Sequence, residues 1–286
     1  MALVFIVTAL IIVLLPGAAH AWGPATHLEI ARGILENTSL ITGAARGLIE
    51  AFPYDFLYGN IAADIVVGKN LVEEIKHCHN WRIGFKLLKK AESDSQRAFA
   101  YGYLSHLAAD TVAHNHFIPE MMLRTFNTRA IRHIHVYWEL RFDVLADKRV
   151  WQLPKKIIKS IHKDNDKLLD SIIEGTPLSF RTNKTIFSSI ITLHRFDQWH
   201  RMLGILSANS KWAIHPNDKK RHFNNAFDSA MDLLSNGHKA ACMKKDPIGK
   251  ARLASAQTTR KRLKALQNNG DDWERALEHA IEETRG

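Results

Sequence analysis

Cysteine is scarce in this chain of 286 residues, which contains only Cys78 and Cys242. Two cysteines cannot form a disulfide framework, and two free, buried thiols are the simpler interpretation. The sequence also lacks a glycine-rich phosphate-binding loop and a Gly-x-Ser-x-Gly nucleophile elbow, the signatures of P-loop proteins and α/β-hydrolases. No strand-like alternation of apolar and polar residues stands out, and no internal repeat is visible.

Positive charge is in excess and is unevenly distributed. The formal net charge is +10, and 46% of the residues are apolar, enough for the core of one large or two small domains. Residues 1–149 carry 15 Lys+Arg and 14 Asp+Glu, whereas residues 150–286 carry 24 and 15. A basic surface attracts phosphate-rich partners such as nucleic acid or an anionic membrane surface. A solvated basic surface without such a partner is an equally good interpretation.

The first 21 residues resemble a targeting segment. They combine an apolar run with Ala19-His20-Ala21, a small-x-small cleavage signature, although no Lys or Arg precedes the run. An uncleaved membrane anchor is the alternative, but the run of about 15 residues is shorter than the ~20 that span a bilayer. We therefore expect a signal peptide at 1–21, a mature chain that starts at Trp22, and export to the periplasm or the extracellular space.

Apolar residues recur at three- and four-residue spacing through most of the chain, which predicts helices. Pro53 is expected to begin an aromatic-rich turn, and Pro119 to stop the helix before it. The fold class predicted is all-α, a multi-helix bundle with a metal-binding helical core at 22–150 and a basic helical half at 151–286 packed on it. The predicted helices span residues 27–36, 40–51, 93–113, 129–147, 155–173, 185–208, 218–242 and 248–284, the last with a break at 268–270.

Two His-x-x-x-carboxylate pairs, His106/Asp110 and His135/Glu139, lie within 34 residues of each other. Residues four apart share one face of a helix, so each pair can aim an imidazole nitrogen and a carboxylate at one point, as a zinc ion requires. Two such pairs indicate a polynuclear metal site. A local ion pair is the structural alternative for His135 and Glu139.

Two histidines between these pairs are further candidate ligands. His114 continues the stripe of His106 and Asp110 at four-residue steps, whereas His116 lies about 120° away from it on a continuing helix. Helical periodicity therefore favours His114 at the first metal. His116, just past the expected helix end, could bind a second metal nearby.

Cleavage after Ala21 would give Trp22 a free α-amine, which can chelate a metal together with its own carbonyl oxygen. The α-amino pKa of about 7.7–8.0 is low enough for zinc to displace the proton near neutral pH. His27 could supply a third ligand. Asp64 stands among apolar residues, and a metal would provide the partner that a buried carboxylate needs. The structural alternatives are a buried anchor for Trp22, a helix cap for His27, and a helix cap or a satisfied surface acid for Asp64.

Residues 77–81 read His-Cys-His-Asn-Trp, a spacing too tight for a zinc finger. In an extended chain His77 and His79 point the same way, whereas in a helix only one of them can face a given site. One metal ligand is expected here, with Cys78 packed as a small hydrophobic residue.

Taken together, these residues resemble the superfamily of trinuclear-zinc phospholipases C and single-strand nucleases, all-helical exported proteins whose mature chain starts with a zinc-binding Trp. The resemblance covers residues 22–139. It rests on the order Trp, His, Asp, His, His-x-x-x-Asp, His, His-x-x-x-Asp/Glu.

The resemblance implies three zinc ions per chain. The first is bound by Trp22 and His27; the second by Asp64, His79, His106 and Asp110, with Asp110 bridging to the first; the third by His116, His135 and Glu139. His79 is preferred to His77 because its 15-residue step from Asp64 fits the nuclease branch, whereas the 14-residue step of the phospholipase branch falls on Cys78. His116 is preferred to His114 because the family's next ligand stands six residues past the aspartate.

The activity that this resemblance implies is hydrolysis of a phosphate ester. Zinc makes hydroxide available near neutral pH and neutralises charge on the phosphate, while Asp64 orients or deprotonates the water. Glu139 and export favour a phospholipase C acting on phospholipids. The step from Trp22 to His27 and the basic half favour a single-strand nuclease instead. A non-enzymic, zinc-stabilised exported protein is the third hypothesis.

Retaining any residue before Trp22 is expected to impair one metal site, because the α-amine would then be part of a peptide bond. Elemental analysis should find close to three zinc ions in the processed chain and fewer in an extended one. An extended protein with undiminished zinc content and activity would contradict the role of the amine. A processed protein without zinc would contradict the metal interpretation altogether.

Overall fold

The protein is all-α in the computed structural model, which describes residues 22–66, 78–128, 134–153, 157, 162–173, 176, 178–193 and 212–285. These ranges contain no strand, so the predicted fold class is confirmed. Within the same ranges, no helix combines the length and the apolar character needed to cross a membrane. The expected signal peptide at 1–21 lies outside the described residues.

The helices divide into those before and those after residue 150. The earlier ones are α2 (Pro24–Glu36), η1 (Thr38–Leu40), α3 (Ala45–Ala51), α4 (Pro53–Ala62), η2 (Ala63–Ile65), α5 (Trp81–Lys90), α6 (Asp94–Val112), η5 (Ala113–Phe117), α7 (Ile118–Arg124) and α8 (Ile134–Asp143). The others are η7 (Lys148–Gln152), which crosses that boundary, α10 (Lys163–Asp170), α11 (Phe180–Leu193), α13 (Pro216–Asn236), η8 (Gly237–Lys239), η9 (Ala241–Lys244), α14 (Lys250–Asn269) and α15 (Trp273–Arg285).

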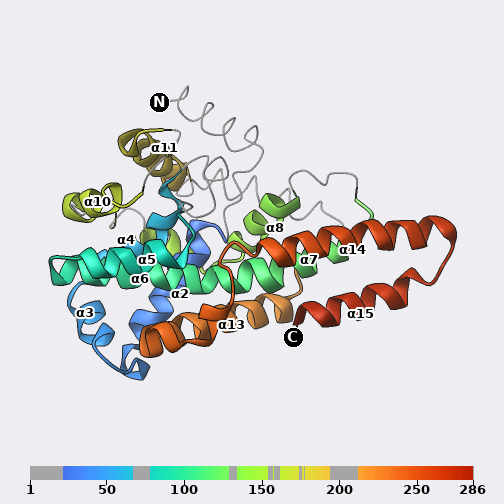
Figure 1. The fold of residues 1–286 in the computed structure, drawn as a ribbon, viewed down its shortest axis with the longest axis horizontal. Coiled ribbons are helices and arrows are strands. Elements are labelled where there is room, and N and C mark those ends of the chain that lie inside the picture. Colours follow the sequence, from blue (N-terminus) through green and yellow to red (C-terminus); the bar gives the residue numbers. More distant parts are fainter. Residues whose placement is uncertain are drawn as a thin grey trace.

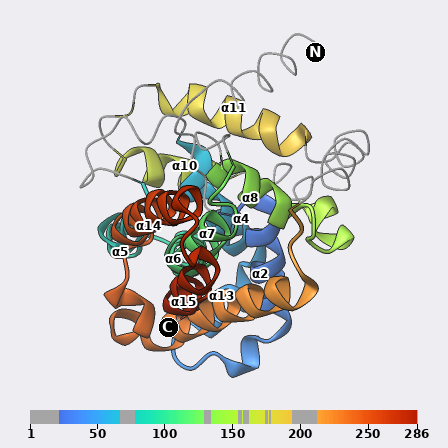
Figure 2. The ribbon, with the colours of Figure 1, turned by 90° about the vertical axis from the view of Figure 1, so that its right-hand side faces the viewer.

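Helix α6 is the centre of the molecule. Figure 2 looks along it and shows α2, α4, α5, α13 and α14 arranged around α6 and α7. The helix starts where the Ser93 hydroxyl accepts the N–H of Gln96 at 3.2 Å, a regular N-cap. From Ala98 to Val112 nearly every residue is buried, so this part of the helix has no solvent face for its polar residues. Polar side chains in this part of α6 must therefore find partners inside the protein.

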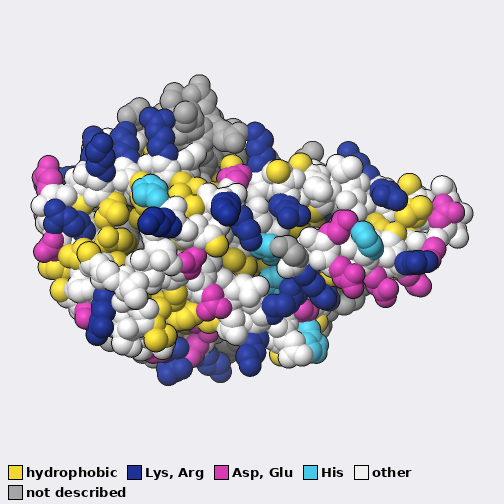
Figure 3. Space-filling view, turned by 60° about the horizontal axis from the view of Figure 1, so that its bottom comes forward, with side chains coloured by type: hydrophobic (Ala, Val, Ile, Leu, Met, Phe, Trp, Pro, Cys, Tyr) yellow, Lys and Arg dark blue, Asp and Glu magenta, His cyan; other side chains and the backbone are white. Residues whose placement is uncertain are grey.

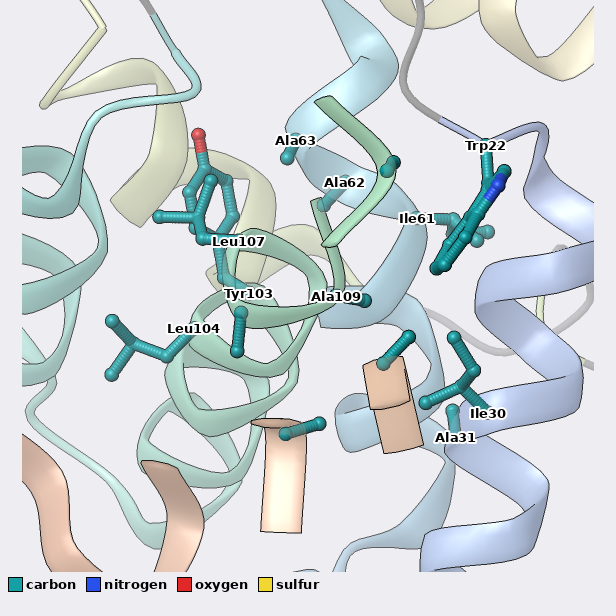
Figure 4. Close-up of a cluster of buried hydrophobic side chains, with 14 of the residues drawn as sticks. Trp22, Ile30, Ala31, Ile61, Ala62, Ala63, Tyr103, Leu104, Leu107 and Ala109 are labelled. Carbon is teal, nitrogen blue, oxygen red and sulfur yellow. The ribbon is translucent and has the colours of Figure 1, made fainter. Parts of the chain in front are cut away.

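A pair of glycines lets α4 cross α6 at very short range. A Cβ atom added to Gly59 would overlap the carbonyl oxygen of Phe99, and one added to Gly102 would overlap the carbonyl oxygen of Phe56. Only glycine permits two backbones to approach so closely. Figure 4 shows apolar side chains of α2, α4 and α6 gathered beside this crossing, among them Ile61.

The residues after the expected cleavage point are firmly packed. Trp22 is fully buried, and its ring stacks on Phe142 with centroids 4.9 Å apart. The Asp143 carboxylate accepts hydrogen bonds from the backbone N–H and the hydroxyl of Thr26, at 2.7 and 2.9 Å. Asp143 thus caps the N-terminus of α2 from α8, and Gly23 leaves the room for it. Burial raises the pKa of Asp143 to about 7, although the Thr26 hydrogen bonds oppose this.

Two expectations about proline are corrected by the structure. Pro53 begins α4 rather than a turn, because the fixed φ of proline suits a first helical position. Pro119 does not stop the helix: the chain stays helical from α6 through the π-helical turn η5 into α7. Pro119 lies in the first turn of α7, where a missing N–H removes no regular hydrogen bond of that helix.

The C-terminal helices combine packing on the core with a projecting arm. Helix α13 adds Ala226, Ala230, Leu233 and Leu234 to the main apolar cluster. Helices α14 and α15 run antiparallel and form the arm in Figure 1, held to α7 by a second cluster that includes Phe126 and Leu263. The face drawn in Figure 3 carries Asp and Glu beside Lys and Arg on this arm.

Substituting Gly102 by alanine is expected to destabilise the protein, because the new Cβ would overlap the backbone of α4. Overpacking of this kind costs about 1–3 kcal/mol in the free energy of unfolding. Gly47 is the matched control: it is an exposed helical glycine with nothing within 4 Å of an added Cβ. Gly47→Ala is expected to stabilise by about 0.5–1 kcal/mol. Urea unfolding followed by circular dichroism measures both; equal effects would contradict the close crossing.

Candidate metal centre

The Asp110 carboxylate is the centre of a buried cluster of histidines. Its oxygens lie 3.2 Å from the Nε2 atoms of His27, His79 and His106. The Nε2 atom of His79 also lies 3.1 Å from the Asp64 carboxylate. The side chains come from α2, η2, the bend before α5, and α6, and each is at most 4% exposed. Residues distant in sequence therefore converge on one point.

Several local contacts bring these side chains together. The Tyr103 hydroxyl donates to the carbonyl oxygen of Cys78 at 2.6 Å, which fixes the bend that carries His79 to α6. The Asn80 side chain accepts the N–H of Arg82 and starts α5 directly afterwards. Cys78 itself is buried, as expected, and His77 lies outside the described residues.

Within the described residues, five of these side chains form two overlapping groups with metal-ligand geometry. In each group the candidate ligand atoms all lie within 4.8 Å of one another. The two groups share the imidazole of His106. They are His27, Asp64 and His106, and His79, His106 and Asp110.

The orientation of His106 suits a metal ligand. Its Nδ1 lies 2.8 Å from the carbonyl oxygen of Asn60, so the neutral ring donates its proton there and turns the Nε2 lone pair toward the cluster. A backbone carbonyl that holds the second nitrogen is the usual support of a metal-bound histidine. The Nε2 atoms of His106 and His79 are 3.0 Å apart, so both rings point at one site.

The charges in this cluster favour a ligating carboxylate. Burial alone would raise the pKa of Asp110, but His106 and His27 outweigh burial and hold it well below the usual range. Burial lowers the pKa of His27, and nearby His106 adds to that effect. Burial opposes protonation of His106 as well, but Asp110 and Asp64 outweigh it and raise its pKa. The pKa shifts of Asp110 and His27 favour an ionised carboxylate and a neutral imidazole, the states that zinc requires.

The donor set fits zinc. Neither oxygen of Asp110 and neither nitrogen of His27 makes a hydrogen bond of acceptable geometry within the described part of the chain. Buried polar atoms normally have such partners, and a bound cation would supply one to the Asp110 oxygens and to Nε2 of His27, the nitrogen that faces them. Imidazole nitrogens and carboxylate oxygens are the ligands that zinc takes in hydrolytic sites.

A third group with ligand geometry consists of His114, His135 and Glu139. The Nε2 atom of His135 lies 2.7 Å from the Glu139 carboxylate, and that of His114 lies 3.9 Å from it. The Nδ1 atom of His114 lies 2.5 Å from the carbonyl oxygen of Pro247, the same arrangement that orients His106. The pair His135/Glu139 is brought together on α8 as expected.

His116 is placed elsewhere, which differs from the expectation that it completes this group. Its Nδ1 donates to the carbonyl oxygen of Thr284 at 2.7 Å, and its Nε2 accepts from the ammonium group of Lys245 at 2.7 Å. His116 lies within the π-helical turn η5, two residues past His114 and therefore on another side of the helix, where Thr284 and Lys245 hold its ring. Helical periodicity placed His114 at the first metal with His106 and Asp110, but His114 belongs to the third group and faces Glu139.

Comparison with known proteins agrees with this geometry. A family model described as zinc-dependent phospholipase C matches residues 26–185, more than half of the chain. The chain belongs to the zinc-dependent phospholipase C family. Neither the curated proteins nor the solved structures contain a match. The matched range includes all candidate ligands from His27 to Glu139, whereas α13, α14 and α15 lie beyond it.

Membership in this family supports zinc as the metal of the cluster and a phospholipase C-like hydrolytic function. The amine role of Trp22 depends on cleavage after residue 21, which lies outside the described residues, and stays a prediction. Two supporting groups were missed from the sequence, the carbonyl oxygens of Asn60 and Pro247. Backbone carbonyls carry no side-chain signal, so no sequence pattern could have revealed them.

Single alanine substitutions of His114 and His116 test which histidine completes the third group. His114→Ala is expected to lose one equivalent of zinc, because it removes the nitrogen that faces Glu139. His116→Ala is expected to keep the full zinc content and serves as the matched control from the same helical turn. Zinc is counted after dialysis, and thermal unfolding verifies the fold of both variants. Zinc loss in His116→Ala with retention in His114→Ala would contradict the assignment.

Proposed function

We propose that this protein is a zinc-dependent phosphodiesterase of the phospholipase C type, which releases phosphorylated head groups from phospholipids. The observation that carries the proposal is the Asp110 carboxylate, buried on α6 within 3.2 Å of three imidazole nitrogens. Family membership supports both the metal and the substrate class.

His27, Asp64, His79, His106 and Asp110 would hold zinc, which would make hydroxide available near neutral pH and neutralise charge on the phosphate. Asp110, with oxygens directed at His27 and at His79 and His106, suits a ligand that bridges two ions. Asp64 is 4% exposed and lies 3.1 Å from His79. Besides binding zinc, Asp64 is proposed to orient the attacking water or to accept its proton.

His114, His135 and Glu139 are proposed to hold the remaining ion, with the His114 ring fixed by the carbonyl oxygen of Pro247. Trp22, freed by signal cleavage, is proposed to add its amine to the ion of His27. Its buried ring, stacked on Phe142, holds the chain in place beside α2 for that purpose. The protein would then act after export, in the periplasm or outside the cell.

A single-strand nuclease with the same metal centre is the second candidate. It is favoured by charge: residues 250–269, the length of α14, contain six Lys and Arg and no Asp or Glu. Such a helix attracts the phosphates of nucleic acid, and equally those of an anionic membrane surface.

A parallel assay separates the two activities. The zinc-loaded mature protein is incubated with phosphatidylcholine vesicles, anionic vesicles and single-stranded DNA, and head-group release and strand cleavage are measured. Release of phosphorylated head groups is expected. Strand cleavage alone would favour the nuclease, and a zinc-loaded protein that cleaves nothing would contradict both.

The Asp64→Asn variant tests the proposed proton acceptor in the same assay. General-base catalysis contributes about 10²–10⁴-fold, so kcat is expected to fall by that factor. Zinc content is measured alongside, because Asp64 is also a proposed ligand. Asp94→Asn, an exposed carboxylate in the first turn of α6, is the control and should keep full activity. An Asp64→Asn variant with wild-type kcat would remove Asp64 from the reaction.

A further inference from the structure

Residues 245–249, between η9 and α14, run alongside the π-helical turn η5. The sequence of this segment is Lys-Asp-Pro-Ile-Gly, and it lies outside the range matched by the family model. It is about 130 residues away in sequence from η5, yet it contacts three consecutive polar side chains there.

The three contacts are made in antiparallel order. The Nδ1 atom of His114 lies 2.5 Å from the carbonyl oxygen of Pro247. The Asn115 amide donates to the carbonyl oxygen of Asp246 at 2.9 Å. The Lys245 ammonium group donates to Nε2 of His116 at 2.7 Å. Lys245, Asp246 and Pro247 thus each engage one residue of η5.

The segment is itself held rigidly. The Asp246 carboxylate accepts the N–H groups of Ile248 at 3.1 Å and Lys250 at 3.2 Å, which closes the turn before α14. On its other side, the indole N–H of Trp81 donates to the carbonyl oxygen of Lys245 at 2.9 Å. A segment fixed at both ends can impose an orientation on the side chains that it contacts.

Gly249 makes the close approach to His114 possible. It has φ +60°, and an added Cβ would lie 2.5 Å from the carbonyl oxygen of His114 and 2.6 Å from its Cβ. Both the positive φ and the contact require glycine at this position. The position of the segment is therefore tied directly to the backbone of the candidate ligand.

We propose that residues 245–249 are a positioning segment for the third metal group, which decides that His114 and not His116 faces Glu139. The proposal rests on the zinc binding proposed above. Donation of the His114 Nδ1 proton to Pro247 turns Nε2 toward Glu139, while Lys245 and Thr284 occupy both nitrogens of His116. The C-terminal part of the chain thereby completes a centre whose ligands all lie in the matched range.

Gly249→Ala tests the positioning segment, and Gly270→Ala is its matched control. The two glycines flank the same helix, α14, and both have a left-handed backbone, with φ +60° and +77°. An added Cβ at Gly270 meets nothing within 4 Å, so the control reproduces the backbone strain without the contact to His114. Zinc affinity is measured for each by competition with a chromophoric chelator, and the fold by circular dichroism.

Gly249→Ala is expected to lower the affinity for one of the zinc ions by about 10- to 100-fold. This is the usual effect of losing a contact that supports a metal ligand. Gly270→Ala is expected to bind zinc like the wild type. The double variant His114→Ala/Gly249→Ala should lose no more zinc than His114→Ala alone, since both act on one ion. Wild-type affinity in Gly249→Ala, or equal weakening in Gly270→Ala, would overturn the proposal.

If Gly249→Ala does not fold, Asn115→Ala provides the measurement, because it removes only the side chain bonded to Asp246 and to Thr111. Weakening of the same zinc equivalent is expected, and unchanged affinity would overturn the proposal. All readouts are metal affinities. A wild-type protein that binds zinc but hydrolyses no phosphodiester would sink the proposed function and leave the positioning test intact.

Discussion

The buried carboxylate of Asp110 is the constraint on which the rest of the structure depends. Removing a carboxylate from water costs several kcal/mol even after the protein relaxes, and nearby positive charge or hydrogen bonds must offset that cost. Here three imidazole nitrogens lie 3.2 Å away, on segments from three parts of the chain. The surrounding helices can pack around α6 only if this charge is compensated. A zinc ion bound by these residues would compensate it and leave the carboxylate ionised.

The fold meets this constraint by close packing around one helix. Gly59 and Gly102 let α4 approach α6 so that the carbonyl oxygen of Asn60 reaches His106. The Asp143 carboxylate sets the start of α2, the helix that carries His27. Each of these contacts contributes little free energy compared with the cost of burying the charge. Together they fix the directions of the His106 and His27 rings, which a metal ion would otherwise have to impose.

A backbone carbonyl oxygen orients a candidate histidine ligand at two places, and the two carbonyls lie at different distances along the chain. The carbonyl oxygen of Asn60 orients His106 from 46 residues away, and that of Pro247 orients His114 from 133 residues away. The second carbonyl comes from the part of the chain beyond the family match. In the described residues, the C-terminal helices are thus joined to the metal centre through His114 as well as to the apolar core through α13.

Much of the site could be predicted from local pattern and chemistry. Four-residue spacing was sufficient for His106/Asp110 and His135/Glu139, because helical geometry alone places such residues on one face. The isolated acid Asp64 and the histidine at position 79 followed from the needs of a buried carboxylate and from family resemblance. The helix through Pro119 was missed, because a π-helical turn has no simple sequence signature.

By itself, then, the sequence determined the helical class, the pairs that share a helix face and the kind of metal they suit, since each depends on neighbours within a turn of helix. Only the tertiary structure decided how separate segments converge on Asp110, and that His114 rather than His116 faces Glu139. The His114 ring has its Nδ1 atom 2.5 Å from a carbonyl oxygen 133 residues away, that of Pro247. Long-range backbone contacts of this kind leave no trace in local periodicity, because any residue can supply the carbonyl.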